Sequence, residues 1–333
     1  MDQIRRLVAA LDRWQRRHRT PGVAYGVVKK FSDDNANLLV VSLAWYGFTA
    51  IFPLLLAVVT LLGFVGQKSL GSTVVSTLHK FPVVGDSFNP ASGQQLHGST
   101  VGLIIGLVGL IYGAQGVTQT AQQAMATVWD VPQFARTGFL PRLGRSLAGL
   151  FTIGGTFLIN APIATYVTRA GESYVIRIPV LVALLLVNSS LYWLSFKILT
   201  PRTVAGKALV PGAILGGVVF TALITVGTGL VTHQLKNASN TYGTFGSVIG
   251  IVAFLLLLAK LSIYAAELNP VLQRRLYPRA LPMGEATEAD KRVQSALVHE
   301  QRRTEDETIG VGFGPDAPQE AAADALSEDK AAR

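Results

Sequence analysis

One apolar stretch, interrupted by only two ionisable side chains, limits most strongly how this chain can fold. It lies within residues 242–270 and reads YGTFGSVIGIVAFLLLLAKLSIYAAELNP. About 20 apolar residues in an α-helix, with a rise of about 1.5 Å each, match the hydrocarbon thickness of a bilayer. The stretch therefore predicts a membrane-spanning helix.

The charged residues are concentrated at the two ends of the chain. Only 15% of the 333 residues are charged, whereas a typical soluble protein has about 25%. Four acids lie between residues 35 and 269: Asp86, Asp130, Glu172 and Glu267. This pattern predicts an all-α polytopic membrane domain over residues 38–276, preceded by a basic segment (1–37) and followed by a charged tail (277–333).

Six apolar runs are long enough to cross a membrane as helices. They cover residues 38–65, 101–126, 143–167, 178–199, 209–232 and 247–268. The loops between them are alternately rich and poor in Lys and Arg, and cytoplasmic loops are the ones that collect these residues. The alternation predicts six transmembrane helices with both termini in the cytoplasm.

The two ends of the chain differ in character. Residues 1–19 carry Ile4, Leu7, Leu11 and Trp14 at helical spacing among arginines, which predicts an amphipathic helix on anionic lipid headgroups at the cytoplasmic membrane surface. We expect residues 20–22 to break this helix and a second short one to cover 23–31. The composition beyond residue 281 predicts a disordered cytoplasmic tail with at most a transient helix over 285–306.

Two charged residues of the last run share one helix face with a tyrosine. Lys260, Tyr264 and Glu267 are spaced i, i+4, i+7, so they are candidates for lining a substrate cavity. Lys260 is too deep for easy contact with the interface, which predicts a polar partner inside the bundle. Its charge then either binds substrate or is merely tolerated, and Glu267, nearer the helix end, is either functional or simply hydrated.

Amide side chains supply further cavity candidates. Gln115, Gln119 and Gln122 form a stripe on the second run, and such groups in a membrane must face protein or water. The stripe forms either a cavity wall or hydrogen bonds between helices. Asn160 precedes Pro162 in the third run and can instead satisfy carbonyls that the proline frees.

Pairs of small residues four positions apart predict close helix packing. These are Gly102 with Gly106, Gly212 with Gly216, and Gly246 with Gly250.

Several classes of chemistry find no support in the sequence. The chain has no cysteine, the five histidines show no metal-binding spacing, and no phosphate-binding GxxxxGK[ST] motif occurs. We expect no metal, no cofactor and no enzymatic activity. The net charge of +9 fits cytoplasmic ends that meet anionic lipid rather than nucleic acid, and association into homo-oligomers stays open.

Several motifs resemble one bacterial family in the same order along the chain. They are ANLLVVSLAWYGFTAIFPLLL after Asp33-Asp34, TVWDV, LVPGA, and YGTFGSVIG through AAELN. Over residues 33–276 the sequence resembles the YihY/BrkB family of inner-membrane proteins, once labelled ribonuclease BN-like. The resemblance implies six transmembrane helices and a role at the cell envelope. Lys260 departs from the aromatic or aliphatic residue usual in that family.

Three functions compete on this basis. The first is a transporter or flippase-like handler of an amphiphilic, anionic envelope component. The second is a non-transporting scaffold that maintains envelope integrity, and the third is a membrane-tethered ribonuclease, for which the sequence holds no metal-ligand cluster.

The predicted topology can be tested because the chain contains no cysteine. Single cysteines at Ser92 and Ser239, which lie in loops poor in positive charge, should react with an impermeant maleimide added outside the inner membrane. Labelling of both positions only from the cytoplasmic side would contradict the assignment.

Overall fold

The computed structural model describes residues 2–65, 100–136, 144–145, 148–149, 152, 174–201, 204–223, 244–282 and 284–313. Within these residues the regular structure is entirely helical. The helices are α1 (Asp2–Arg17), α2 (Arg19–Asp33), α3 (Ala36–Val65), α6 (Thr100–Val128), α8 (Tyr174–Leu199), α10 (Thr244–Gln273) and α11 (Glu288–Glu300). Two short 3₁₀ helices are η3 (Gln133–Ala135) and η4 (Gly206–Leu209), and η4 opens a longer helix that reaches residue 223.

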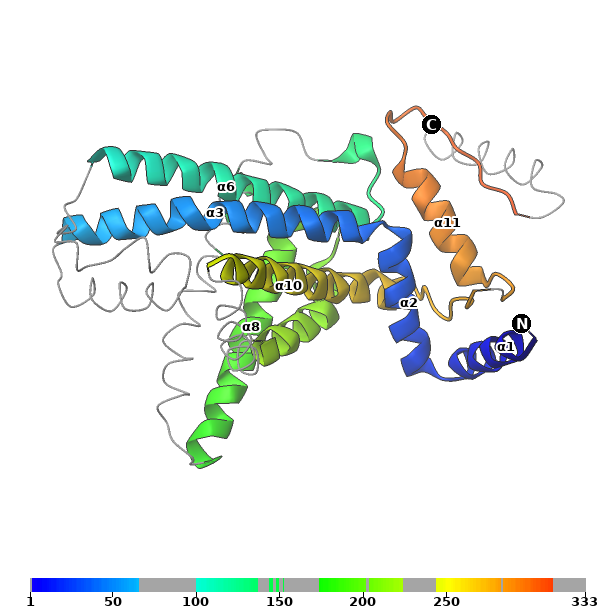
Figure 1. The fold of residues 1–333 in the computed structure, drawn as a ribbon. Helices are drawn as coiled ribbons and strands as arrows, with labels where there is room; N and C mark the ends of the chain where they lie inside the picture. Colours follow the sequence, from blue (N-terminus) through cyan, green and yellow to red (C-terminus); the bar gives the residue numbers. More distant parts are fainter. Residues whose placement is uncertain are drawn as a thin grey trace.

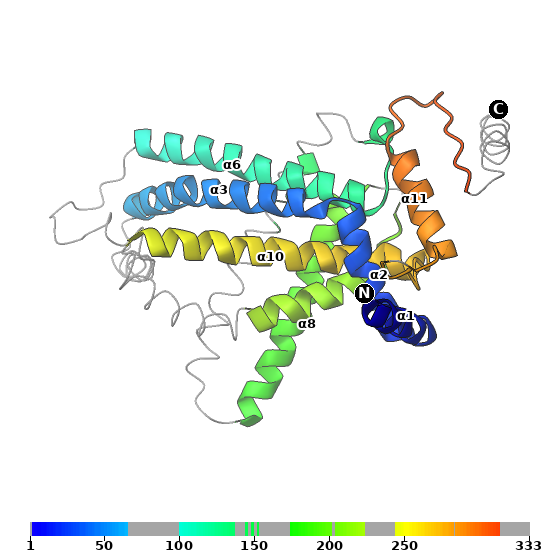
Figure 2. The ribbon, with the colours of Figure 1, turned by 45° about the vertical axis from the view of Figure 1, so that its right-hand side comes forward.

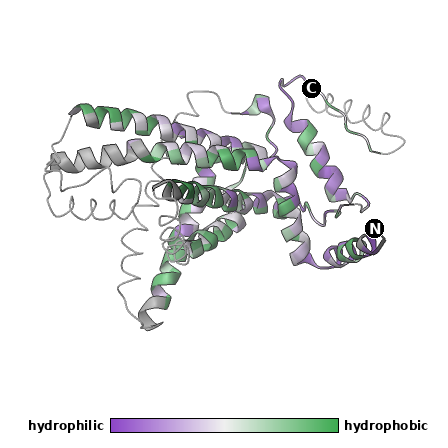
Figure 3. Ribbon diagram, viewed as in Figure 1, coloured by the Kyte–Doolittle hydropathy of each residue, from purple (hydrophilic) through white to green (hydrophobic). Residues whose placement is uncertain are grey.

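The long apolar helices form one bundle, and the charged segments gather at one end of it. The helices α3, α6 and α10 run alongside one another (Figures 1 and 2), while α1, α2 and α11 lie at their far end. Apolar residues dominate α6 and α10, and polar residues dominate α11 (Figure 3). The amino-acid sequence thus separates into a part suited to lipid and a part suited to water.

Four helices in the described part of the chain are long and apolar enough to cross a membrane: Leu103–Val128, Ile178–Leu199, Gly206–Leu223 and Val248–Gln273. Each coincides with a predicted span, and α3 contains a further apolar helix over Ala36–Ile51. The predicted span 143–167, with Asn160, lies almost wholly outside the described residues. The number six therefore stays a prediction.

Glycines allow these helices to approach closely. A Cβ atom at Gly212 would overlap the Ala265 carbonyl oxygen, and the Gly212 N–H donates to Oδ1 of Asn269 at 2.7 Å. Gly216 lies against the Tyr192 ring of α8. The other two predicted pairs lie in α6 (Gly102 with Gly106) and in α10 (Gly246 with Gly250). Of these, Gly106 is buried and Gly250 is half-buried.

The break between the first two helices falls earlier than predicted. It lies at His18, which is extended (φ −116°, ψ 123°), and α2 begins at Arg19. The prediction of a break at residues 20–22 was wrong because Pro21 lies in the first turn of a helix, where its missing N–H has no intrahelical acceptor to lose.

The first helix is attached to the rest of the chain by its polar side. Gln15 is buried, and its Nε2 donates to the Arg279 carbonyl at 2.5 Å. Asp12 accepts from the Leu281 N–H at 3.0 Å. The apolar side chains of Leu7, Leu11 and Trp14 are exposed instead, so α1 presents its apolar face outward.

The segment after the last span is folded at least through α11, which corrects the prediction of a disordered tail from residue 277. Val293 of α11 is buried with Val27, Val271 and Leu276 in a small apolar cluster. The helix begins with a capping box, in which Thr287 accepts from the Asp290 N–H and the Asp290 side chain accepts from the Thr287 N–H. A helix over 285–306 was expected to be at most transient, but α11 is stably packed because a few apolar side chains suffice when a partner surface is present.

Asp290 is the polar anchor of α11. Its carboxylate accepts from Nε of Arg279 at 2.6 Å, from Nζ of Lys29 at 2.7 Å and from the Ala280 N–H at 2.9 Å. Burial by itself disfavours the charged form, but these hydrogen bonds outweigh it and hold the pKa of Asp290 below its ordinary value. The contacts join α11 to α2 and to the end of α10.

We predict that Asp290 makes the docking of α11 sensitive to acid. Because its pKa is lower in the folded state, the stability it contributes is present above about pH 4 and is lost as the pH falls further. Asp290→Asn should lower the stability of docking by about 2 kcal/mol and remove this acid dependence, as measured by protease cleavage within residues 282–300. Glu288→Gln, at an exposed carboxylate on the same helix, is the control and should behave like the natural protein.

Candidate functional site

A completely buried lysine lies among three carboxylates where α2 crosses the end of α10. The Nζ atom of Lys30 is 2.6 Å from Asp34 and 3.2 Å from Asp130. A third carboxylate, that of Glu267, lies 3.7 Å from the same atom. The side chains of Lys30, Asp34 and Glu267 have 0% of their surface exposed. We call Lys30, Asp34, Asp130, Glu267 and Arg274 the ion cluster.

Local backbone structure brings the members of the ion cluster together. Lys30 and Asp34 are one turn apart at the end of α2, and Glu267 faces them from α10. Asp130 follows α6 with φ 50°, a left-handed conformation that Asp tolerates better than most residues. The turn directs its carboxylate to both Lys30 and Arg274, whose Nη1 lies 2.6 Å away.

Burial and charge act in opposite directions in the ion cluster. Burial disfavours the ammonium of Lys30, but the carboxylates around it raise the pKa of Lys30 above its ordinary value. Burial raises the pKa of Asp34 despite the adjacent ammonium. Removing one charge from such a group leaves another unpaired in a low dielectric, so its members depend on one another.

One of the two predicted alternatives for Glu267, that its side chain is simply hydrated, does not hold. It is fully buried, and among the described residues neither of its oxygen atoms accepts a hydrogen bond. Sequence position near the end of a span suggested contact with water, but α2 covers this end of α10.

A polar pocket of about 230 Å³ lies along the C-terminal half of α6. Its lining includes Gln119 and Gln122 of the predicted stripe, together with Gln123, Tyr46 and Arg136. Gln115 is half-buried on α6 and does not line this pocket. The stripe thus divides, with its C-terminal part facing a cavity.

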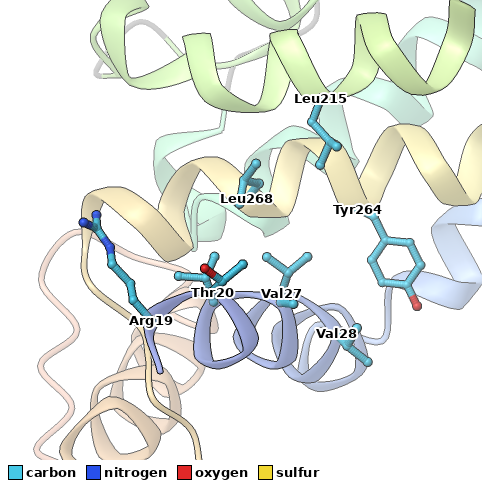
Figure 4. Close-up of a pocket in the computed structure, with 9 residues that line it drawn as sticks. Arg19, Thr20, Val27, Val28, Leu215, Tyr264 and Leu268 are labelled. Carbon is cyan, nitrogen blue, oxygen red and sulfur yellow. The ribbon is translucent and has the colours of Figure 1, made fainter. Parts of the chain in front are cut away.

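An apolar groove of about 490 Å³ lies between α2, α10 and the helix that follows η4. Figure 4 shows Val27, Leu215 and Leu268 facing one another across it, with Arg19 at one end and Tyr264 at the other. Of the residues predicted to form one cavity, Tyr264 alone lies here. One end of the groove is cationic and the rest is apolar.

Lys260 lies apart from both cavities, and the prediction that it is held inside the bundle was wrong. Its side chain is exposed, and its ammonium lies 5.9 Å from the centre of the Phe31 ring. Phe31, at the end of α2, provides this aromatic face at the surface of α10.

Most of the ion cluster was not predicted from the sequence. Lys30 and Asp34 were counted only as parts of the basic segment over residues 1–37. A signal was present in the four acids of the long apolar region, because an acid there requires a cationic partner. Asp130 and Glu267 are two of these four, but nothing in the sequence pairs them with a lysine a hundred residues or more away.

The described part of the chain contains no group of three His, Asp or Glu side chains placed to hold a metal ion. In the ion cluster, where three carboxylates converge, the ammonium of Lys30 lies between them.

These features define a helical membrane protein whose apolar spans are closed at one end by a folded, highly charged cap. Residues 27–290 match the family Virulence factor BrkB, and the chain belongs to that family. The match begins within α2 and ends in α11, so it includes the whole ion cluster. No curated protein and no solved structure matches the chain.

We predict that Lys30 is essential to the stability of the bundle end. Lys30→Met keeps most of the side-chain volume but leaves three carboxylates without their central cation, which should cost about 3–5 kcal/mol. Thermal unfolding in detergent measures the loss. Lys291→Met removes a lysine with an exposed partner on α11 and should cost less than about 1 kcal/mol; equal effects of the two substitutions would contradict the prediction.

Proposed function

We propose that the protein binds an anionic amphiphile of the bacterial inner membrane in the apolar groove and moves it between the membrane and the polar pocket. The observation that carries this proposal is the composition of the groove, which has an apolar wall and an arginine at one end. An amphiphile with one or more acyl chains and an anionic headgroup matches both features. The protein thus acts as a transporter or flippase-like handler and not as an enzyme.

The apolar wall suits an acyl chain. Val23, Val27, Leu215 and Leu268 line it, and two of its three helices belong to candidate spans. A chain from the surrounding lipid can therefore enter without crossing water. Burial of apolar surface stabilises such a complex by about 25 cal/mol per Å².

The cationic end suits a phosphate or carboxylate. Arg19 lies at the junction of α1 and α2, and Arg13 and Arg17 are exposed on the preceding helix. Guanidinium groups bind such anions through paired hydrogen bonds. Arginines near the membrane surface also raise the local concentration of anionic lipid.

The first helix supports a position at the cytoplasmic membrane surface. Its exposed Leu7, Leu11 and Trp14 suit the acyl boundary of the bilayer, while its polar side is attached to the protein. With α1 inserted in this way, the groove beside α2 opens at headgroup depth.

In this proposal the polar pocket is the second binding site for the amphiphile. It offers Arg136 and the amides of Gln119 and Gln122, which suit a headgroup rather than an acyl chain. Arg136 is also paired with Glu300 of α11 at 2.6 Å, so the docked α11 competes with an anion for this arginine.

Filling the groove should abolish lipid binding without unfolding the protein. Ala24→Trp places an indole in the groove, and Arg19→Gln removes the cationic end while leaving the apolar wall intact. We expect the first to eliminate crosslinking of a photoreactive phosphatidylglycerol and the second to reduce it about tenfold, the equivalent of about 1.4 kcal/mol.

The matched control is Val41→Trp, at an exposed position of α3 that does not line the groove. It should crosslink like the natural protein. If Ala24→Trp retains both crosslinking and complementation of a deletion strain, the groove is not the lipid site, and a scaffold that only maintains envelope integrity becomes the better explanation.

A further inference from the structure

The ion cluster contains an unequal number of positive and negative groups. The cations are Lys30 and Arg274, and the acids are Asp34, Asp130 and Glu267. Two positive and three negative charges leave one negative charge in excess. Glu300 and Arg136 pair with each other at 2.6 Å, so this neighbouring pair adds no net charge.

Within the residues that the structure describes, the ion cluster also lacks hydrogen-bond donors for some of its buried carboxyl oxygens. Oδ1 of Asp34 and both oxygens of Glu267 are buried without a hydrogen-bond donor in the described part of the chain. The two carboxyl groups converge on one atom, because Nζ of Lys30 lies 2.6 Å from Asp34 and 3.7 Å from Glu267, so a hydrogen bond between them would satisfy both. Two carboxylates cannot form that bond, because neither has a proton to donate.

We infer that Asp34 and Glu267 share one proton, and that this site couples proton binding to movement of the amphiphile. A proton on one carboxyl removes the excess charge and supplies the missing donor in one step. The O–H formed on one side chain donates to an oxygen of the other. This inference concerns the driving ion, and its link to transport depends on the function proposed above.

The electrostatic surroundings favour this arrangement. Among the described residues, the charged groups around the pair are Lys30 from α2, Asp130 from the end of α6, Arg274 after α10, and the Glu300 carboxylate of α11, which is paired with Arg136. Lys30 stabilises one negative charge on the pair, but a second one in the same buried space is repelled by the first and by Asp130. The raised pKa of Asp34 agrees with this, and the pair titrates as a unit.

The cluster reaches the protein surface on one side, and the proton has a mechanical effect. Arg274, which is paired with Asp130, has 40% of its side chain exposed. Loss of the proton breaks the bond between α2 and α10 and leaves two carboxylates that repel each other. The same two helices form the groove, because Val27 lies one turn before Lys30 and Tyr264 one turn before Glu267.

Infrared spectroscopy tests the shared proton directly. The full-length protein in nanodiscs of phosphatidylethanolamine and phosphatidylglycerol should show the carbonyl stretch of a protonated carboxyl at neutral pH, shifted in D₂O and lost on alkalinisation. Glu267→Gln and Asp34→Asn should each remove this band, and both amides retain a donor that replaces the proton. Glu288→Gln, at an exposed site, should leave it unchanged.

Glu300 needs its own variant because burial raises the pKa of this carboxyl as well. Any band removed by Glu300→Gln is assigned to Glu300 and not to the pair. Absence of a further band in the natural protein, or its survival in both Glu267→Gln and Asp34→Asn, overturns the inference. If one of the two variants fails to fold, loss of the band in the other, together with its survival in Glu300→Gln, still assigns it to the pair.

Lipid binding separates this inference from the proposed function. Crosslinking of photoreactive phosphatidylglycerol should vary with pH in the natural protein and become independent of pH in Glu267→Gln. Crosslinking without the carboxyl band refutes the proton site and leaves the proposed function standing. A carboxyl band without crosslinking refutes the groove and leaves the proton site standing, whereas both signals with no pH dependence refute the coupling.

Discussion

The burial of Lys30 is the interaction on which this end of the molecule depends. An ammonium without contact to solvent is tolerated only when carboxylates surround it, and here they come from three separate parts of the chain: Asp34, Asp130 and Glu267. Each of these parts must be in place for the others to be stable. The cluster therefore fixes α2 across the end of α6 and α10.

The long helices could be predicted from the sequence, whereas the folded end could not. Apolar runs report directly on length and burial in lipid, so α6, α8 and α10 coincide with predicted spans. The ion cluster instead joins Lys30 to Glu267, residues more than 200 positions apart, and a single sequence contains no periodic signal for such a pair. Depth along a helix was also a poor guide, because Lys260 is exposed and Glu267 is buried.

The two short charged helices show why composition misleads at such an end. In α11, Val293 is covered and Asp290 is satisfied by partners from α2 and from the segment after α10. In α1, the buried side chains are polar, Asp12 and Gln15, and the apolar ones are exposed. Both helices form specific hydrogen bonds to distant residues, which average hydrophobicity does not register.

The helix α2 takes part in each of these features. One face of this helix carries Lys30 and Asp34 into the ion cluster, and another carries Val23 and Val27 into the groove. A third contact, from Lys29 to Asp290 at 2.7 Å, holds α11. The helix α2 therefore takes part in the ion cluster, in one wall of the apolar groove and in the attachment of α11, whose Glu300 is paired with Arg136 at the polar pocket. Because packed helices move as units rather than deform, a shift of α2 would affect all three together.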